Sequence, residues 1–196
     1  MKLIQLFESQ FPSSREDIEA ICKQFEITNY TINNDLSIDV NGDVNLRGQY
    51  LEAIPIKFNY VSGDFWCNRN KLPSLKGAPK LVGGDFWCSW NKLENLEGAP
   101  REVGGSMWCS DIGLASLKGA PREVGGTFQC TQNKLENLIG APRHVGGNFN
   151  CGWNKLTTLE GAPKTVGQHF YCEHNPDLKS LDGIGNVGGR IFSDLT

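Results

Sequence analysis

Hydrophobic side chains recur along most of this chain with a fixed period of 21 residues. Each period holds a valine, a bulky apolar residue four positions later, a cysteine two positions after that, and leucines five and eight positions beyond the cysteine. The cysteines are Cys67, Cys88, Cys109, Cys130, Cys151 and Cys172. Leu46 and Ser193 stand at the same position one period before the first cysteine and one period after the last. A period in this range predicts a solenoid with about eight coils.

The pattern inside one period predicts a strand followed by a turn. The bulky apolar residue and the cysteine are two positions apart, so both side chains face the same, inward side of a strand. An asparagine follows most cysteines by three positions, and its amide can hydrogen-bond the backbone that leaves the strand. These asparagines are Asn70, Asn91, Asn133, Asn154 and Asn175. The rest of the period is rich in glycine and proline, which favours extended or tightly turned segments over helices.

The repeated shape FxCxxNxLxxL predicts a mainly β, leucine-rich-repeat-like solenoid with a parallel sheet on one face. We assign residues 38–196 to this solenoid and residues 1–37 to an N-terminal helical cap with a lead-in strand. Residues 1–11 carry apolar side chains at helical spacing, and Pro12 ends that segment. A capping-box-like start and a helical apolar pattern predict an amphipathic helix from about 14 to 25, which covers the open end of the first coil. Alternation of period two from Asn29 onward predicts a short hairpin.

Composition and charge narrow the classes of partner. The formal net charge of −3 and the pI of about 5.6 provide no overall attraction to nucleic acid or to an anionic membrane surface. The N-terminal segment lacks the long apolar run and the cleavage site of a signal peptide, and no segment has the apolar length of a membrane helix. We therefore expect a soluble, intracellular protein without a membrane partner.

The cysteine pattern favours reduced thiols in the core. Seven cysteines are an odd number, and six of them recur with the period of the core instead of in the close pairs of a zinc site. A buried free thiol behaves as a small hydrophobic group. Cys22, on the apolar face of the predicted cap helix, takes the same role. Disulfides or a metal are the alternatives, and no cofactor is expected.

The repeat resembles a known family. The sequence GAPKxVGGDFxCxxNxLxxLxGAP, with the entry segment NYTIN and IDVNGDVNL before it, is similar to leucine-rich-repeat-like proteins encoded by tailed bacteriophages, from about residue 17 to the end. The resemblance implies a phage gene product that acts in the host cytoplasm, and it supplies no catalytic residue. The chain departs from the pattern at Ile112 and Gly113, at its two end coils, and at the insertion Pro176-Asp177.

Aromatic residues gather in the column one position before the cysteines, on the outward face of the predicted strands. Trp66, Trp87 and Trp108 occupy this column in three consecutive coils, and Tyr171 occupies it further on. Trp90 lies near the strand exit and widens the surface. Three exposed tryptophans approach the apolar area at which a surface patch marks an interaction site. The alternative is a stacking ladder that only stabilises neighbouring strands.

Charged residues follow the same repeat. Asp64 and Asp85 stand three positions before their cysteines, and carboxylates beside indoles suit a partner that offers Arg or Lys; a solvated acidic edge is the alternative. Columns of Lys and Arg recur with the repeat, but glutamates accompany them, so nucleic-acid binding is not favoured. His169, Glu173 and His174 lie close in sequence without a paired nucleophile and base or a further ligand column, so we expect no enzyme and no metal site.

These observations predict a non-enzymatic protein-binding module. We expect its strand-lined face, with Trp66, Trp87 and Trp108 as anchors and Asp64, Asp85, Trp90 and Tyr171 around them, to bind a host bacterial protein. The resemblance implies inhibition of a defence or metabolic factor as the purpose. Two alternatives remain open: binding of a glycan or a single-stranded nucleic acid on the same tryptophans, and homo-assembly through the C-terminal edge strand.

Overall fold

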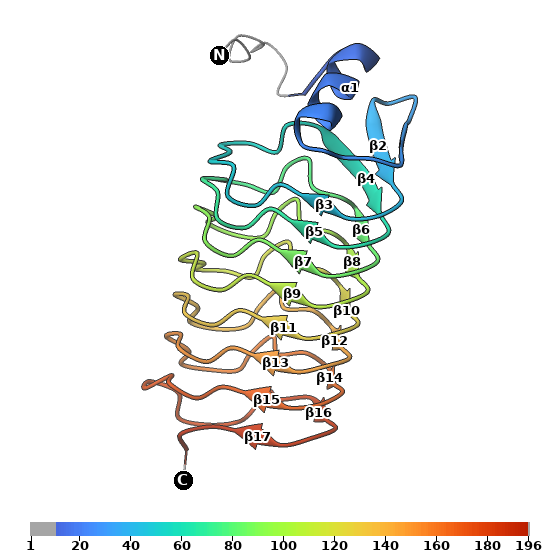
Figure 1. Cartoon of the computed structure of the whole chain (residues 1–196). Helices are drawn as coiled ribbons and strands as arrows, with labels where there is room; N and C mark the ends of the chain where they lie inside the picture. Colours follow the sequence, from blue (N-terminus) through green and yellow to red (C-terminus); the bar gives the residue numbers. More distant parts are fainter. Residues whose placement is uncertain (1–10, 196) are drawn as a thin grey trace.

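The protein is an elongated stack of coils with a helix near its N-terminal end (Figure 1). The computed structural model describes residues 11–195. Each coil advances the chain by 21 residues and adds strands to parallel sheets. The prediction of a mainly β solenoid with coils of this length is confirmed. The apolar helical segment predicted over residues 1–11 lies outside the described residues, apart from Phe11, whose side chain is half-buried.

One sheet, here called the aromatic sheet, has eight parallel strands within residues 11–195 and carries the bulky apolar residue of each period. Its strands are β3 (Val44–Asn45), β5 (Phe65–Trp66), β7 (Phe86–Trp87), β9 (Met107–Trp108), β11 (Phe128–Gln129), β13 (Phe149–Asn150), β15 (Phe170–Tyr171) and β17 (Ile191–Phe192). Neighbouring strands pair at the spacing of the repeat, so Trp66 lies beside Trp87 and Trp87 beside Trp108. Equivalent residues of successive coils therefore form straight columns across the sheet.

A second sheet, here called the valine sheet, has nine strands in the described part of the chain and was not predicted. Its strands are β1 (Tyr30–Ile32), β2 (Ser37–Val40), β4 (Lys57–Val61), β6 (Leu81–Val82), β8 (Glu102–Val103), β10 (Glu123–Val124), β12 (His144–Val145), β14 (Thr165–Val166) and β16 (Asn186–Val187). It forms because the repeated valine and the residue before it are also extended and meet their equivalents in the next coil, as Leu81 meets Glu102. The predicted hairpin is confirmed, since β1 pairs antiparallel with β2 at one edge of this sheet.

Two glycines turn the chain from the valine sheet into the aromatic sheet in most coils. A Cβ atom on Gly125 would lie 2.1 Å from the carbonyl oxygen of Gly104 in the preceding coil. A Cβ atom on Gly84 would lie 2.1 Å from Oδ1 of Asp64. Glycine is needed here because adjacent coils come into contact at this corner, through backbone at the first position and through a side chain at the second.

The core runs the length of the solenoid. In the coil of Cys88 the buried apolar side chains include Val82, Phe86, Leu93 and Leu96, and the coils from Cys67 to Cys151 share this set. The phenylalanine rings of adjacent coils stack with centroids 5.1 to 5.6 Å apart. Because each coil buries its apolar residues against the next one, the core is a continuous column and no coil has a core of its own.

The predicted asparagine ladder is confirmed. Oδ1 of Asn154 accepts a hydrogen bond from the N–H of Leu135 at 3.1 Å, and its Nδ2 donates to the carbonyl oxygens of Cys130 and Cys151, both at 3.0 Å. The same arrangement recurs at Asn70, Asn91, Asn133 and Asn175. Each amide therefore joins its own coil to the one before it.

The N-terminal cap consists of α1 (Arg15–Gln24) and the hairpin, and it lies over the first coils (Figure 1). The Ser14 side chain accepts a hydrogen bond from the Asp17 N–H and caps the helix, close to the predicted start. Ile18 and Cys22 are buried and belong to the solenoid core, so α1 covers the apolar end of the stack as predicted. Among residues 11–195, no helix has the length and apolar character to cross a membrane.

Candidate functional site

The three predicted anchor tryptophans lie in adjacent, in-register positions on β5, β7 and β9. Their side chains are half-buried, whereas the sequence predicted an exposed ladder. The rings of Trp87 and Trp108 stack at a centroid distance of 4.6 Å and an angle of 11°. Within the described part of the chain, no such ring contact joins Trp66 to Trp87. Two of the three tryptophans therefore stack on each other.

The stacked pair carries an energetic cost. The Nε1 atoms of Trp87 and Trp108 are both buried, and neither has a hydrogen-bond partner in residues 11–195. A buried donor without an acceptor costs about 1–3 kcal/mol. Stacking does not require an N–H group, because the phenylalanine rings of the core stack without one. Stability alone therefore does not explain tryptophan at these two positions.

The predicted acidic column has a structural role. Oδ1 of Asp64 accepts a hydrogen bond from the N–H of Asp85 at 2.7 Å, and Oδ1 of Asp85 accepts one from the N–H of Ser106 at 2.6 Å. We call this set the acceptor column: Asp43, Asp64, Asp85, Ser106, Thr127, Asn148 and His169. The shared property of its members is a short side chain with an acceptor atom, not a charge.

A second column, two positions after the cysteines, presents two exposed tryptophans, Trp90 and Trp153. We call it the exit column: Arg69, Trp90, Asp111, Gln132, Trp153 and His174. All six residues have φ between 54° and 60°, a region that non-glycine residues rarely occupy. Gly48 has the same conformation at the same position of the first coil, with φ of 67°. The conformation is thus a property of the fold, and it directs each of these side chains into solvent.

Trp90 is exposed and held in place by its neighbours in the exit column. Its side chain is 46% exposed. Its Nε1 donates to Oδ2 of Asp111 at 2.9 Å, and the guanidinium of Arg69 lies 4.8 Å from its ring centroid. The sequence placed Trp90 only at the margin of the site, because the exposure of this column depends on the backbone turn.

Trp153 repeats this exposure three coils further on. It is 58% exposed, and its ring lies 3.9 Å from the ring of His174 in a tilted contact. Tyr171 lies on β15, three strands beyond β9, which corresponds to about 14 Å at the usual strand spacing. It stacks on Phe192 at 4.7 Å and 6°. The structure therefore separates Tyr171 from the predicted anchors and places it near the C-terminal end.

All seven cysteines lie within the described region, and none of them is exposed. All seven cysteines are free and buried, and burial raises the pKa of Cys88, Cys109 and Cys151 well above its usual range and that of Cys172 to about 11. Thiolates, the reactive form, are therefore disfavoured. His169 is a member of the acceptor column, with its Nδ1 2.9 Å from the backbone N of Arg190. Residues 11–195 contain no group of three or more His, Cys, Asp or Glu side chains arranged to hold a metal ion.

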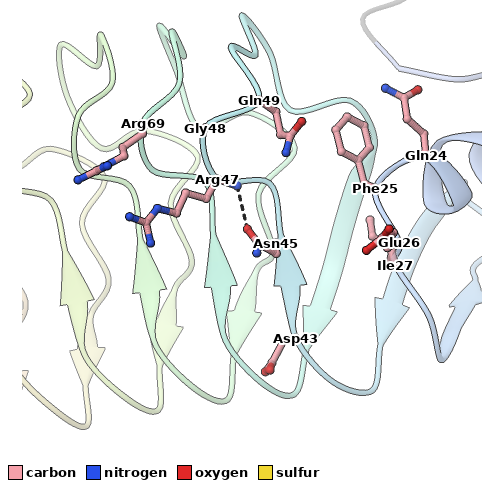
Figure 2. A pocket seen from close by; sticks show the side chains of 10 residues that line it. All are labelled: Gln24, Phe25, Glu26, Ile27, Asp43, Asn45, Arg47, Gly48, Gln49 and Arg69. Carbon is pink, nitrogen blue, oxygen red and sulfur yellow. Dashed lines mark hydrogen bonds between the residues drawn. The ribbon is translucent and has the colours of Figure 1, made fainter.

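Two hollows were not predicted, because each depends on how the coils stack. A pocket of about 590 Å³ lies between the end of α1 and the first coils, with Arg47 and Arg69 on one side and Phe25 and Glu26 on the other (Figure 2). Charges of both signs line it, so it favours no single class of ligand. A groove of about 510 Å³ follows the outer face of the valine sheet, with exposed Leu81 and glycine backbone among its walls.

Comparison with known proteins supplies no relative: no family model, no curated protein and no solved structure matches this chain.

Proposed function

We propose that this chain is a non-enzymatic protein-binding module. Its binding surface is the outer face of the aromatic sheet from the second to the fourth coil, together with the adjacent part of the exit column. The observation that carries this proposal is the state of Trp90, which is nearly half exposed and yet fixed by Asp111 and Arg69.

A fixed and exposed tryptophan is suited to binding a protein. Binding a flexible side chain costs rotamer entropy, and contacts that already hold it reduce this cost. Tryptophan and arginine are also the residues that contribute most often to the energy of protein interfaces. Trp90 and Arg69 are adjacent on this surface, so a partner can cover both at once.

The tryptophan ladder extends this surface. Trp66, Trp87 and Trp108 are half-buried, so each still presents part of its ring beside the exit column. The unpaired N–H groups of Trp87 and Trp108 support a role for this ladder beyond stability. Asp64 and Asp85 contribute less than the sequence predicted, because each uses one carboxylate oxygen in the acceptor column.

The resemblance to phage repeat proteins extends the proposal to the partner. A phage product in the host cytoplasm meets bacterial proteins, so we propose a host protein as the partner and inhibition of a defence or metabolic factor as the effect. The specific support for a protein over a nucleic acid is the absence of an overall positive charge.

The test compares two exposed tryptophans of the same column. The tagged chain is expressed in bacteria, the captured partner is identified by mass spectrometry, and its affinity for purified variants is measured by calorimetry. Trp90→Ala should weaken binding by about tenfold or more, the effect of removing an interface hot spot. Trp153→Ala is the matched control, because this residue is more exposed but lies outside the proposed surface, and it should change the affinity little. Equal losses in both variants, or none in Trp90→Ala, would contradict the proposal.

A glycan or a single-stranded nucleic acid is the second candidate, because Arg69 lies over the exposed Trp90 ring and bases or sugars can stack there. Titration of tryptophan fluorescence with oligonucleotides at low and high salt, and with oligosaccharides, separates the two candidates. We expect no saturable quenching. Quenching that weakens with salt would favour nucleic acid, and salt-independent quenching by oligosaccharides would favour a glycan.

A further inference from the structure

Cationic side chains of the candidate surface gather around Trp90. Arg69 lies one coil before it, with its guanidinium 4.8 Å from the Trp90 ring centroid. Lys92 follows Trp90 by two residues, and Lys71 holds the same position one coil earlier. All three residues are exposed, and none of them takes part in an ion pair within residues 11–195. We call Arg69, Lys71 and Lys92 the basic group.

The fold brings the basic group together. Adjacent coils lie about 4.8 Å apart, and the Arg69 N–H donates to the carbonyl oxygen of Ser89 at 3.0 Å, which holds these parts of the two coils side by side. The Lys92 N–H donates to the carbonyl oxygen of Leu72 at 3.0 Å in the same way. Figure 2 shows that the guanidinium of Arg47, from the first coil, points away from α1, as does that of Arg69. A fourth cation therefore faces the same direction.

Negative charge is smaller in the surroundings of Trp90. Asp85 precedes Trp90 by five residues, which corresponds to about 15 Å along an extended chain. A charge at that distance is largely screened, because the Debye length is about 8 Å at physiological ionic strength. Asp111 is close and accepts the hydrogen bond of the Trp90 ring, but it is a single carboxylate. Positive charge therefore predominates around Trp90.

We propose that the partner segment that covers Trp90 is an acidic segment of a protein, with carboxylates that pair with the basic group. This inference rests on the function proposed above and adds the chemistry of the partner. It reverses the charge that the sequence predicted, since the acidic column favoured a partner with Arg or Lys. Guanidinium and ammonium groups form charged hydrogen bonds with carboxylates, which are stronger than neutral ones. An apolar residue beside these carboxylates covers the exposed part of the Trp90 ring.

The length of the positive surface favours a protein segment over a nucleic acid. In the coil that follows Trp90, Asp111 and Gly113 stand where Arg69 and Lys71 stand in theirs. The cations therefore extend over three coils, about 10 Å at the usual strand spacing, and then meet a carboxylate. Sites for single-stranded nucleic acid follow the backbone over about 4–16 nucleotides. A surface of this length fits a few carboxylates better than a run of phosphates.

Short peptides of defined charge test the proposal. One peptide alternates pairs of glutamates with single leucines, and the second has lysine in place of glutamate. Each carries a fluorophore and is titrated with the 196-residue chain while the anisotropy is measured. The acidic peptide should bind at least about tenfold more tightly than the basic one, and its binding should weaken as salt is added. An oligothymidylate of similar length is the third probe and should bind more weakly than the acidic peptide.

Two double variants with the same change of charge locate the site. Lys71→Glu/Lys92→Glu replaces two attractions by two repulsions, so it should weaken binding of the acidic peptide by about tenfold. Lys134→Glu/Lys155→Glu is the matched control, because these exposed lysines hold the same position in later coils, beside Trp153. It should change the affinity by less than about threefold. Thermal melting of both variants shows whether they fold.

Three results would overturn the proposal: an acidic peptide that does not bind, one that binds no more tightly than the basic peptide or the oligothymidylate, and equal losses in the two double variants. The proposed function has its own test, in which Trp90→Ala weakens binding of the captured partner. A loss in that test, combined with an acidic peptide that does not bind, would retain the binding surface and exclude an acidic partner segment. No loss in Trp90→Ala would contradict the proposed function itself.

Discussion

Oδ1 of Asp85 lies 2.6 Å from the backbone N of Ser106, one coil further along the chain. The nitrogen stands at the corner between the two sheets, where the next coil turns into its aromatic strand. A side chain of the preceding coil therefore takes the place of a backbone carbonyl. Because the bond needs only an acceptor, the column admits Asp, Ser, Thr, Asn and His.

This relationship predicts the result of two substitutions at one position. Asp85→Ala removes the acceptor and should lower the free energy of unfolding by about 1–3 kcal/mol, because the Ser106 N–H loses its partner at a part-buried site. Asp85→Asn keeps an acceptor and should cost much less, since Asn148 already fills this position in another coil. Urea denaturation measures both. If both variants lost the same free energy of unfolding, the negative charge of Asp85 and not its acceptor atom would be the stabilising feature.

The asparagine ladder predicts a larger effect in the core. Asn154→Ala leaves the Leu135 N–H and the carbonyls of Cys130 and Cys151 without their partner, so we expect a loss of about 3 kcal/mol or more in denaturant unfolding. Asn154→Asp keeps the acceptor but sets a second oxygen against two carbonyl oxygens, so it should be destabilising as well. The opposite change, Ile112→Asn, completes the column in its coil and should be tolerated at a buried position. An Asn154→Asp variant that is as stable as the unchanged chain would contradict this account.

The thiol column predicts a loss of stability at alkaline pH. Burial raises the pKa of Cys172 to about 11 and that of the other repeat cysteines as well, so the folded protein keeps protons that the unfolded chain releases above its usual cysteine pKa of about 8.5. The stability is fully present below that pH. Above it, the free energy of unfolding should fall by about 1.4 kcal/mol per pH unit for each thiol, until the folded-state pKa is reached.

Urea denaturation between about pH 8 and pH 10 measures this slope. Cys109→Ala should reduce the slope by the contribution of one thiol. This reduction does not depend on how far the cavity left by the missing sulfur lowers the stability at neutral pH. A stability that does not change up to about pH 10 would show that the thiols are accessible to solvent or already ionised.

The corner glycines predict a contrast between two glycine substitutions. Gly125→Ala places a Cβ atom 2.1 Å from the Gly104 carbonyl oxygen, so coils must separate and the loss should exceed about 3 kcal/mol. Gly48→Gln places its side chain in open space, and Gln132 has the same backbone conformation at the equivalent position, so its cost should be about 1–2 kcal/mol. Thermal melting ranks the two variants. If Gly48→Gln were the more destabilising variant, the close contact between coils would not lie at Gly125.

The candidate surface was only partly predictable. The period placed Trp66, Trp87 and Trp108 in one outward column, and the structure keeps them there. Their half-burial and the greater exposure of Trp90 depend on the backbone turn after each strand. The residue types in the exit column do not indicate this turn. Tyr171 belongs to the same column but lies three strands away from Trp108, because the column extends along the whole sheet.

The sequence by itself determined the solenoid, its coil length, the asparagine ladder and the buried cysteines, because each coil repeats the same apolar positions and must stack on its neighbour to bury them. The tertiary structure decided what lies between those positions. The second sheet and the acceptor column arise from contacts between residues about 20 positions apart. Such contacts depend on the distance and orientation of two coils, and a list of residue types contains neither.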